Sequence, residues 1–165
     1  MKVLYDFFLN NFSWKGTIIV VISLLPSTVM VFFPPVNQPK IQGKIPLTIL
    51  EITGRIAIIF ILLFAKNSFE RKIDIWFILM CIFGLIYYVG WIRFFFSGRT
   101  YELLYKPLFF IPIPLAIFPI LAFTFAAIWG RNIFLGIAVF VMAVGHIPQS
   151  CIYYSRIKNK LRREE

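Results

Sequence analysis

The chain has few charged residues, and this scarcity indicates its class. Only 15% of its 165 residues are Asp, Glu, Lys or Arg, whereas soluble domains carry about a quarter. The hydrophobic share is 60%, and the mean hydropathy is +0.84. The charges stand between long apolar runs, which is the pattern of a polytopic membrane protein. The apolar runs occupy so much of the chain that no separate soluble domain is expected.

Residue types that carry common chemistries are also scarce. One histidine and two separated cysteines, Cys81 and Cys151, match no metal-ligand or redox motif. No glycine-rich phosphate loop is present, and Ser150 with His146 lacks the orientation that a catalytic triad needs. We therefore expect neither a metal nor another cofactor. The two cysteines are expected in different halves of the membrane, too far apart for a disulfide.

Acidic residues are few beside basic ones: 7 Asp and Glu stand against 17 Lys and Arg, a formal net charge of +10. The basic residues cluster at the ends of apolar segments, which favours contact with membrane lipids over nucleic-acid binding. By the positive-inside rule, a basic C-terminal tail is cytoplasmic in a multi-pass protein of the cell membrane. The N-terminus then lies on the opposite side. The basic residues of the tail are Arg156, Lys158, Lys160, Arg162 and Arg163.

The long apolar runs predict an all-α fold, a polytopic integral membrane bundle of five transmembrane helices. Residues 1–15 are amphipathic and predict a short helix lying in the membrane interface. Residues 16–154 form a single transmembrane domain, and residues 155–165 form the basic tail. The five spans are expected at about 17–33, 47–65, 75–96, 107–129 and 133–154.

The prolines predict where the helices of the spans are kinked or broken. Pro26 predicts a kink in the first span, because it cannot donate a backbone hydrogen bond. Pro107 suits the first turn of the fourth span. That span also contains Pro112, Pro114 and Pro119, so a kinked or locally broken helix is expected there.

Glu51 and Arg55 lie within the second span, one helical turn apart, so their side chains share a face and can pair. Ionisable residues in a span usually face the bundle interior or a wet cavity. A rise of 1.5 Å per residue places Arg55 roughly 12 Å into its span. Tyr88 and His146 come out at a similar depth from the same membrane surface.

The fifth span carries a polar face formed by His146, Gln149, Ser150 and Tyr153, which should point inward. Together these positions predict a polar pocket in the cytoplasmic half of the bilayer. The short loop that carries Arg99 and Glu102 is expected to close the mouth of this pocket. The expected ligand-binding residues are Glu51, Arg55, Tyr88, Trp91, Arg99, Glu102, His146 and Gln149.

This pattern favours a protein that binds or transports a small anionic or amphiphilic ligand, with Arg55 as its counter-ion. One alternative is an accessory subunit of a larger membrane complex, as a homo- or hetero-oligomer. Another is an enzyme that modifies a lipid or isoprenoid, with Glu51 or His146 transferring a proton. In a purely structural interpretation, Glu51 and Arg55 only neutralise each other, and His146 is a core residue.

Overall fold

The computed structural model describes residues 10–39, 42–108 and 110–164, and the side chains up to residue 159. Within these ranges the protein is all-α and has no strand beyond isolated β-bridges. The predicted N-terminal interfacial helix lies mostly outside the described residues. The helices are α2 (Trp14–Phe32), α3 (Ile45–Phe64), α4 (Lys66–Phe69), α5 (Ile75–Phe96), α6 (Pro114–Trp129) and α7 (Ile133–Glu164), with the 3₁₀ turn η1 (Tyr101–Leu104).

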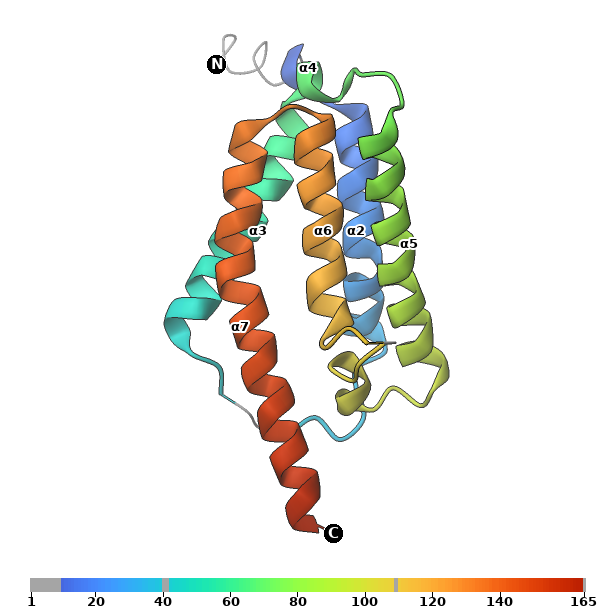
Figure 1. Ribbon diagram of the computed structural model, residues 1–165, viewed down its shortest axis with the longest axis vertical. Coiled ribbons are helices and arrows are strands. Elements are labelled where there is room, and N and C mark those ends of the chain that lie inside the picture. The colour runs from blue at the N-terminus through green and yellow to red at the C-terminus, as the bar shows by residue number, and fades with distance from the viewer. Residues whose placement is uncertain (1–9, 40–41, 109, 165) are drawn as a thin grey trace.

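Four helices of the described chain are long and apolar enough to cross a membrane: α2, α3, α5, and α7 as far as Asn159. They match four of the predicted spans closely and lie side by side (Figure 1). Their outward faces carry large apolar side chains. On α3, for example, Ile52, Ile56 and Phe60 recur four residues apart and are each more than half exposed. Such a face suits contact with lipid hydrocarbon, as the predicted multi-pass membrane protein requires.

The fourth span was predicted at about 107–129, and its predicted start was wrong. Its helix, α6, begins only at Pro114 and has 16 residues, about 24 Å at 1.5 Å per residue. Ile113, between two prolines, adopts a left-handed conformation with φ of 44°. Before it, Leu108 and Ile111 exchange backbone hydrogen bonds in a turn. The α conformation is disfavoured for a residue that precedes proline, so α6 cannot extend from Pro114 towards the N-terminus.

The basic tail was expected to follow the fifth span as a separate segment. Instead, α7 continues as one helix of 32 residues to Glu164 and extends past the rest of the bundle (Figure 1). No glycine or proline follows Pro148, so the sequence offers no signal that would end the helix earlier.

Glycines set the most extensive helix contact, between α3 and α7. A Cβ atom on Gly54 would lie 2.7 Å from the Cα of Met142, so no larger residue fits there. A Cβ atom on Gly145 would likewise overlap the backbone of Glu51 and Leu47. Small residues are the usual means by which membrane helices approach closely. These two glycines therefore fix the register of α3 against α7.

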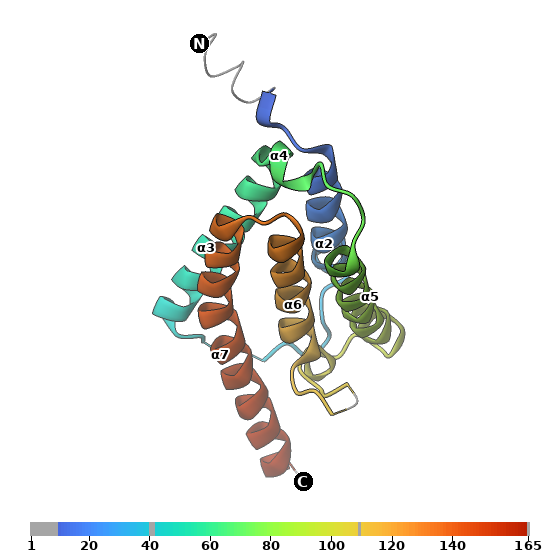
Figure 2. The same ribbon diagram turned by 45° about the horizontal axis from the view of Figure 1, so that its top comes forward.

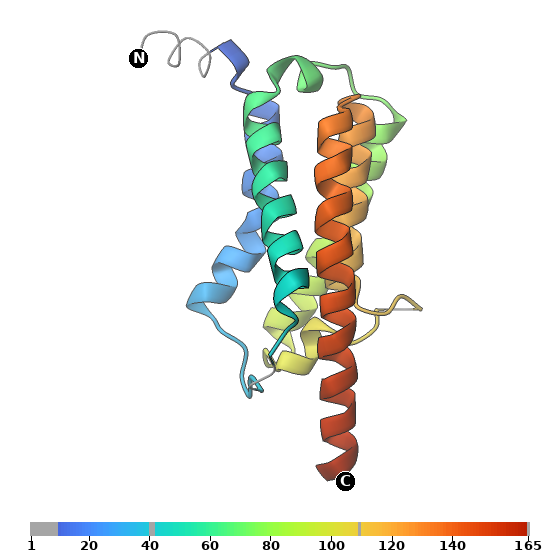
Figure 3. The same cartoon turned by 90° about the vertical axis from the view of Figure 1, so that its left-hand side faces the viewer.

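The remaining helices enclose a core beside this pair. Figures 1 and 2 show α6 between α7 and α5. One buried cluster includes Ile58, Leu62 and Trp129, and a second, aromatic cluster lies between α5 and α6. In Figure 3 the C-terminal half of α2 bends away from α3. Pro26 is inside α2, where a kink was predicted.

Candidate functional site

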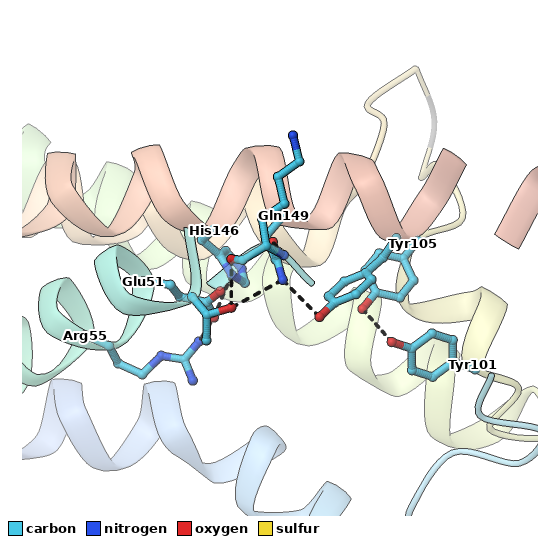
Figure 4. Close-up of polar contacts among 9 residues, drawn as sticks. Glu51, Arg55, Tyr101, Tyr105, His146 and Gln149 are labelled. Atoms are coloured by element: carbon cyan, nitrogen blue, oxygen red, sulfur yellow. Dashed lines mark hydrogen bonds and ion pairs between the residues drawn. The ribbon is translucent and has the colours of Figure 1, made fainter. Parts of the chain in front are cut away.

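A cluster of three ionisable side chains lies where α3 meets α7 (Figure 4). Arg55 Nη2 donates a 2.6 Å hydrogen bond to Glu51 Oε1. His146 Nδ1 lies 3.1 Å from the same oxygen. Gly145, in contact with the backbone of Glu51, brings its neighbour His146 within reach of the carboxylate. The predicted pairing of Glu51 with Arg55 is thus confirmed, and His146 joins it.

Arg55 is only partly engaged by this cluster. Among the described residues Glu51 is its one hydrogen-bonding partner, through Nη2, so Nη1 and Nε are left for water or a ligand. The Arg55 side chain is 46% exposed, whereas those of Glu51 and His146 are 18% and 20% exposed. The cluster is neutral when His146 is neutral and carries one positive charge when His146 is protonated.

A cavity of about 110 Å³ adjoins the cluster, between α2, α3, α5, α6 and α7. Arg55 and His146 contribute to its wall. Three further polar side chains line it: Ser23 and Ser27 of α2, and Tyr87 of α5. The rest of the lining is apolar. The cavity therefore combines a cation with hydroxyl groups in an apolar surrounding, which is the usual make-up of a small-ligand site.

Gln149 is buried but serves the structure around the cavity. Its Oε1 accepts a hydrogen bond from the backbone N of Lys44 (3.2 Å). Its Nε2 donates to Tyr153 Oη (3.0 Å) and, more weakly, to Thr48 Oγ1 (3.4 Å). A Cβ atom on Gly43 would overlap this amide. Gln149 thus fastens the loop before α3 to α7 and is not free to bind a ligand.

Tyrosines continue this polar network towards the end of the bundle (Figure 4). The phenols of Tyr101 and Tyr105 are hydrogen-bonded at 3.2 Å, and the ring of Tyr105 contacts that of Tyr153 at a centroid distance of 5.8 Å. Burial raises the pKa of both the Tyr101 and the Tyr105 phenol. Both therefore stay protonated at neutral pH and keep their ability to donate.

Two of the predicted pocket residues on α5 lie away from the cluster. Tyr88 donates a hydrogen bond to the backbone oxygen of Ile22 and lines an outer groove between α2 and α5. Trp91 is buried in the aromatic cluster, where its ring contacts Tyr87 and Phe94. Its Nε1 has no hydrogen-bond partner in the described part of the chain. The residue of α5 that lines the cavity is Tyr87.

The two predicted residues of the mouth also lie elsewhere. The Arg99 guanidinium carbon is 5.8 Å from the centre of the Phe33 ring, a cation–π contact. Glu102 lines a separate hollow of about 230 Å³ together with Lys106 and Lys158. Of the eight predicted residues, the structure therefore brings Glu51, Arg55 and His146 together around one oxygen, with Gln149 about one helical turn away.

The described residues contain no group of three or more His, Cys, Asp or Glu side chains that could hold a metal ion. Both cysteines are free, as expected from their predicted depths. Comparisons with protein-family models, with curated proteins and with solved structures found no match to this chain.

Proposed function

We propose that this protein binds a small anionic amphiphile, whose negatively charged group is held by Arg55 beside His146. The observation that carries the proposal is that Arg55 lines a cavity and that its guanidinium has two nitrogens without a partner among the described residues. A guanidinium presents its donors as a planar fork that matches carboxylates and phosphates. A side chain that served only as a brace for Glu51 would not need to face a cavity.

The charge balance supports an anionic ligand. Of the two oppositely charged residues in the cluster, Arg55 lines the cavity and Glu51 does not. A carboxylate or a phosphate in the cavity would therefore meet a positive charge in an apolar surrounding, where unpaired charges are costly.

The size of the cavity limits which part of the ligand it can hold. Pockets for drug-sized ligands have volumes of about 300–1,000 Å³. The present cavity, at about 110 Å³, is much smaller. It suits a polar headgroup of a few atoms, and the rest of the ligand would lie outside it.

The proposal includes five membrane crossings in the cell membrane. The helix α6 is short for a span, but it lies between α5 and α7 and follows the apolar turn at residues 107–113. A helix somewhat shorter than the hydrocarbon thickness is accommodated by local thinning of the bilayer. The basic C-terminal end of α7 is then cytoplasmic, together with the loops at 33–44 and 97–113.

Binding is tested with the protein in nanodiscs of phosphatidylcholine, with dodecanoate and its uncharged methyl ester as probes. We expect dodecanoate, at a hundredfold excess over its Kd, to raise the thermal midpoint by about 5 °C. The methyl ester should have little effect. The shift should be lost in Arg55→Gln. An equal shift with the ester would contradict the proposal.

A pair of variants on α2 tests the cavity without touching the ion pair. Ser27 and Thr28 both donate their hydroxyl to the backbone oxygen of Leu24, but only Ser27 lines the cavity. Ser27→Leu should fill the cavity and abolish the shift caused by dodecanoate. Thr28→Leu, the matched control, should bind like the wild type. Binding that survives Ser27→Leu would place the ligand elsewhere.

A second candidate function rests on the contact between His146 and Glu51. A carboxylate 3.1 Å from Nδ1 orients the imidazole and leaves Nε2 available to transfer a proton. The corresponding activity is the modification of a lipid or isoprenoid bound in the cavity. Mass spectrometry of membrane lipid extracts incubated with wild type and with His146→Gln tests this candidate. The enzymatic candidate is supported if the wild type forms a product that His146→Gln does not form, although this variant still binds dodecanoate.

A further inference from the structure

A groove of about 510 Å³ runs along the outside of the bundle between α2 and α5, with α6 as its floor. Its volume falls within the range of small-ligand pockets, about 300–1,000 Å³. The lining is apolar except for Ser23 and the Tyr88 phenol, and the phenol is already engaged by the Ile22 carbonyl. Only a hydrocarbon group fits these walls without leaving a polar atom unpaired.

One residue in the wall of the groove lacks a side chain. Gly84 of α5 lies in its wall, and a Cβ atom there would meet no atom within 4 Å. The direct contact between α2 and α5 is slight compared with that between α3 and α7. A leucine at this position would project into the groove and fill part of it.

The groove and the polar cavity are neighbours. Ser23 of α2 and Phe123 of α6 line both of them. The cavity also has Arg55 in its lining, whereas the groove is lined mainly by apolar side chains. A polar site and an apolar site in contact match the two ends of one amphiphilic molecule.

From this continuity we infer that the groove holds the hydrocarbon chain of the ligand whose anionic group Arg55 binds. The ligand is then a single-chain fatty acid, and it reaches the cavity sideways from the bilayer past Ser23 and Phe123. This inference rests on the proposed function and names its ligand class.

Chain length provides the test, with hexanoate, decanoate and hexadecanoate as probes in phosphatidylcholine nanodiscs. The comparison at each length is between a variant and the wild type, so partitioning into the bilayer cancels. Gly84→Leu should weaken hexadecanoate binding about tenfold or more, because methylenes excluded from the groove lose their apolar contacts. Hexanoate binding should stay unchanged in this variant.

A matched control comes from α7. Gly136 is also half-buried, and a Cβ atom there also meets nothing within 4 Å, but it lines neither the groove nor the cavity. Gly136→Leu should bind all three fatty acids like the wild type. If Gly84→Leu does the same, the groove is not the chain site, although the proposed function stands. If no fatty acid binds the wild type, the proposed function itself fails.

Protection of Cys81 from alkylation gives a second test, which requires no substitution in the groove. Cys81 lines the groove and is exposed, and Cys151 is exposed outside it. Hexadecanoate should slow alkylation of Cys81 by N-ethylmaleimide several-fold and leave Cys151 unaffected. Hexanoate should protect neither cysteine. Equal rates at Cys81 with and without hexadecanoate, under conditions where it binds, would overturn the inference.

Discussion

The Tyr88 phenol of α5 donates a 2.5 Å hydrogen bond to the backbone oxygen of Ile22 in α2. Pro26 lies four residues after Ile22 and has no N–H, so this carbonyl lacks its usual helical donor. A carbonyl without a partner is costly in lipid, and a neighbouring side chain commonly provides one. The bond therefore stabilises a helix kink and joins α2 to α5 beside the apolar groove.

The first prediction is that Tyr88→Phe destabilises the protein by about 1 kcal/mol, the usual worth of such a bond. The loss should nearly vanish in a Pro26→Ala background, because an alanine N–H can bond to Ile22 within the helix. Unfolding of the single and double variants in mixed micelles measures this coupling. Tyr154→Phe is the control, since that phenol has no hydrogen bond to any residue in the described part of the chain. Equal losses in both backgrounds would contradict the explanation.

The lack of an amphipathic pattern in α5 explains why Tyr88 was predicted in the pocket and Tyr87 was missed. The helix α5 is apolar all round, so no amphipathic pattern tells which of two adjacent tyrosines faces inward. Depth alone cannot separate them, because neighbouring residues on a helix differ mainly in direction. In α3 the charged pair itself marked the inward face, and the prediction for Glu51 and Arg55 was accordingly sharper.

Two further features could not be predicted from the sequence, for different reasons. Ser23 and Ser27 line the cavity because α2 packs against α3, and the spacing of polar residues in α2 does not encode that neighbour. The inward polar face of α7 was predicted, and Gln149 and Ser150 are indeed buried. However, the partner of Gln149 is the backbone of Lys44, in a loop whose path depends on the whole fold.

The second prediction concerns the close contact of α3 with α7. Gly145→Ala should lower the free energy of unfolding by about 1–3 kcal/mol, because the added methyl group overlaps the backbone of Glu51 and Leu47. Gly136→Ala, on the same helix with open space around it, should be neutral or slightly stabilising. Thermal unfolding of both variants in the same detergent makes the comparison. Similar losses in the two variants would contradict the packing explanation, because helix propensity alone makes alanine the more stable residue at both positions.

The third prediction concerns the orientation of the bundle in the membrane. Single cysteines are introduced at Lys44 and Lys158, at one end of the bundle, and at Lys66 and Arg131, at the other, after Cys81 and Cys151 have been replaced by serine. A membrane-impermeant maleimide applied to intact cells should label only the cysteines at positions 66 and 131. The other two should react only after permeabilisation. The reverse pattern would place the basic C-terminal end of α7 outside the cell.

The fourth prediction separates the charge of Arg55 from its role as a partner of Glu51. Glu51→Gln leaves a guanidinium without its carboxylate, and Arg55→Gln leaves the carboxylate with His146 alone, so each should destabilise the protein. The double variant carries neither charge and should be more stable than either single one. It should nevertheless fail to bind dodecanoate, because the donor fork is gone. A stable double variant that still bound the fatty acid would show that Arg55 is only a structural partner of Glu51.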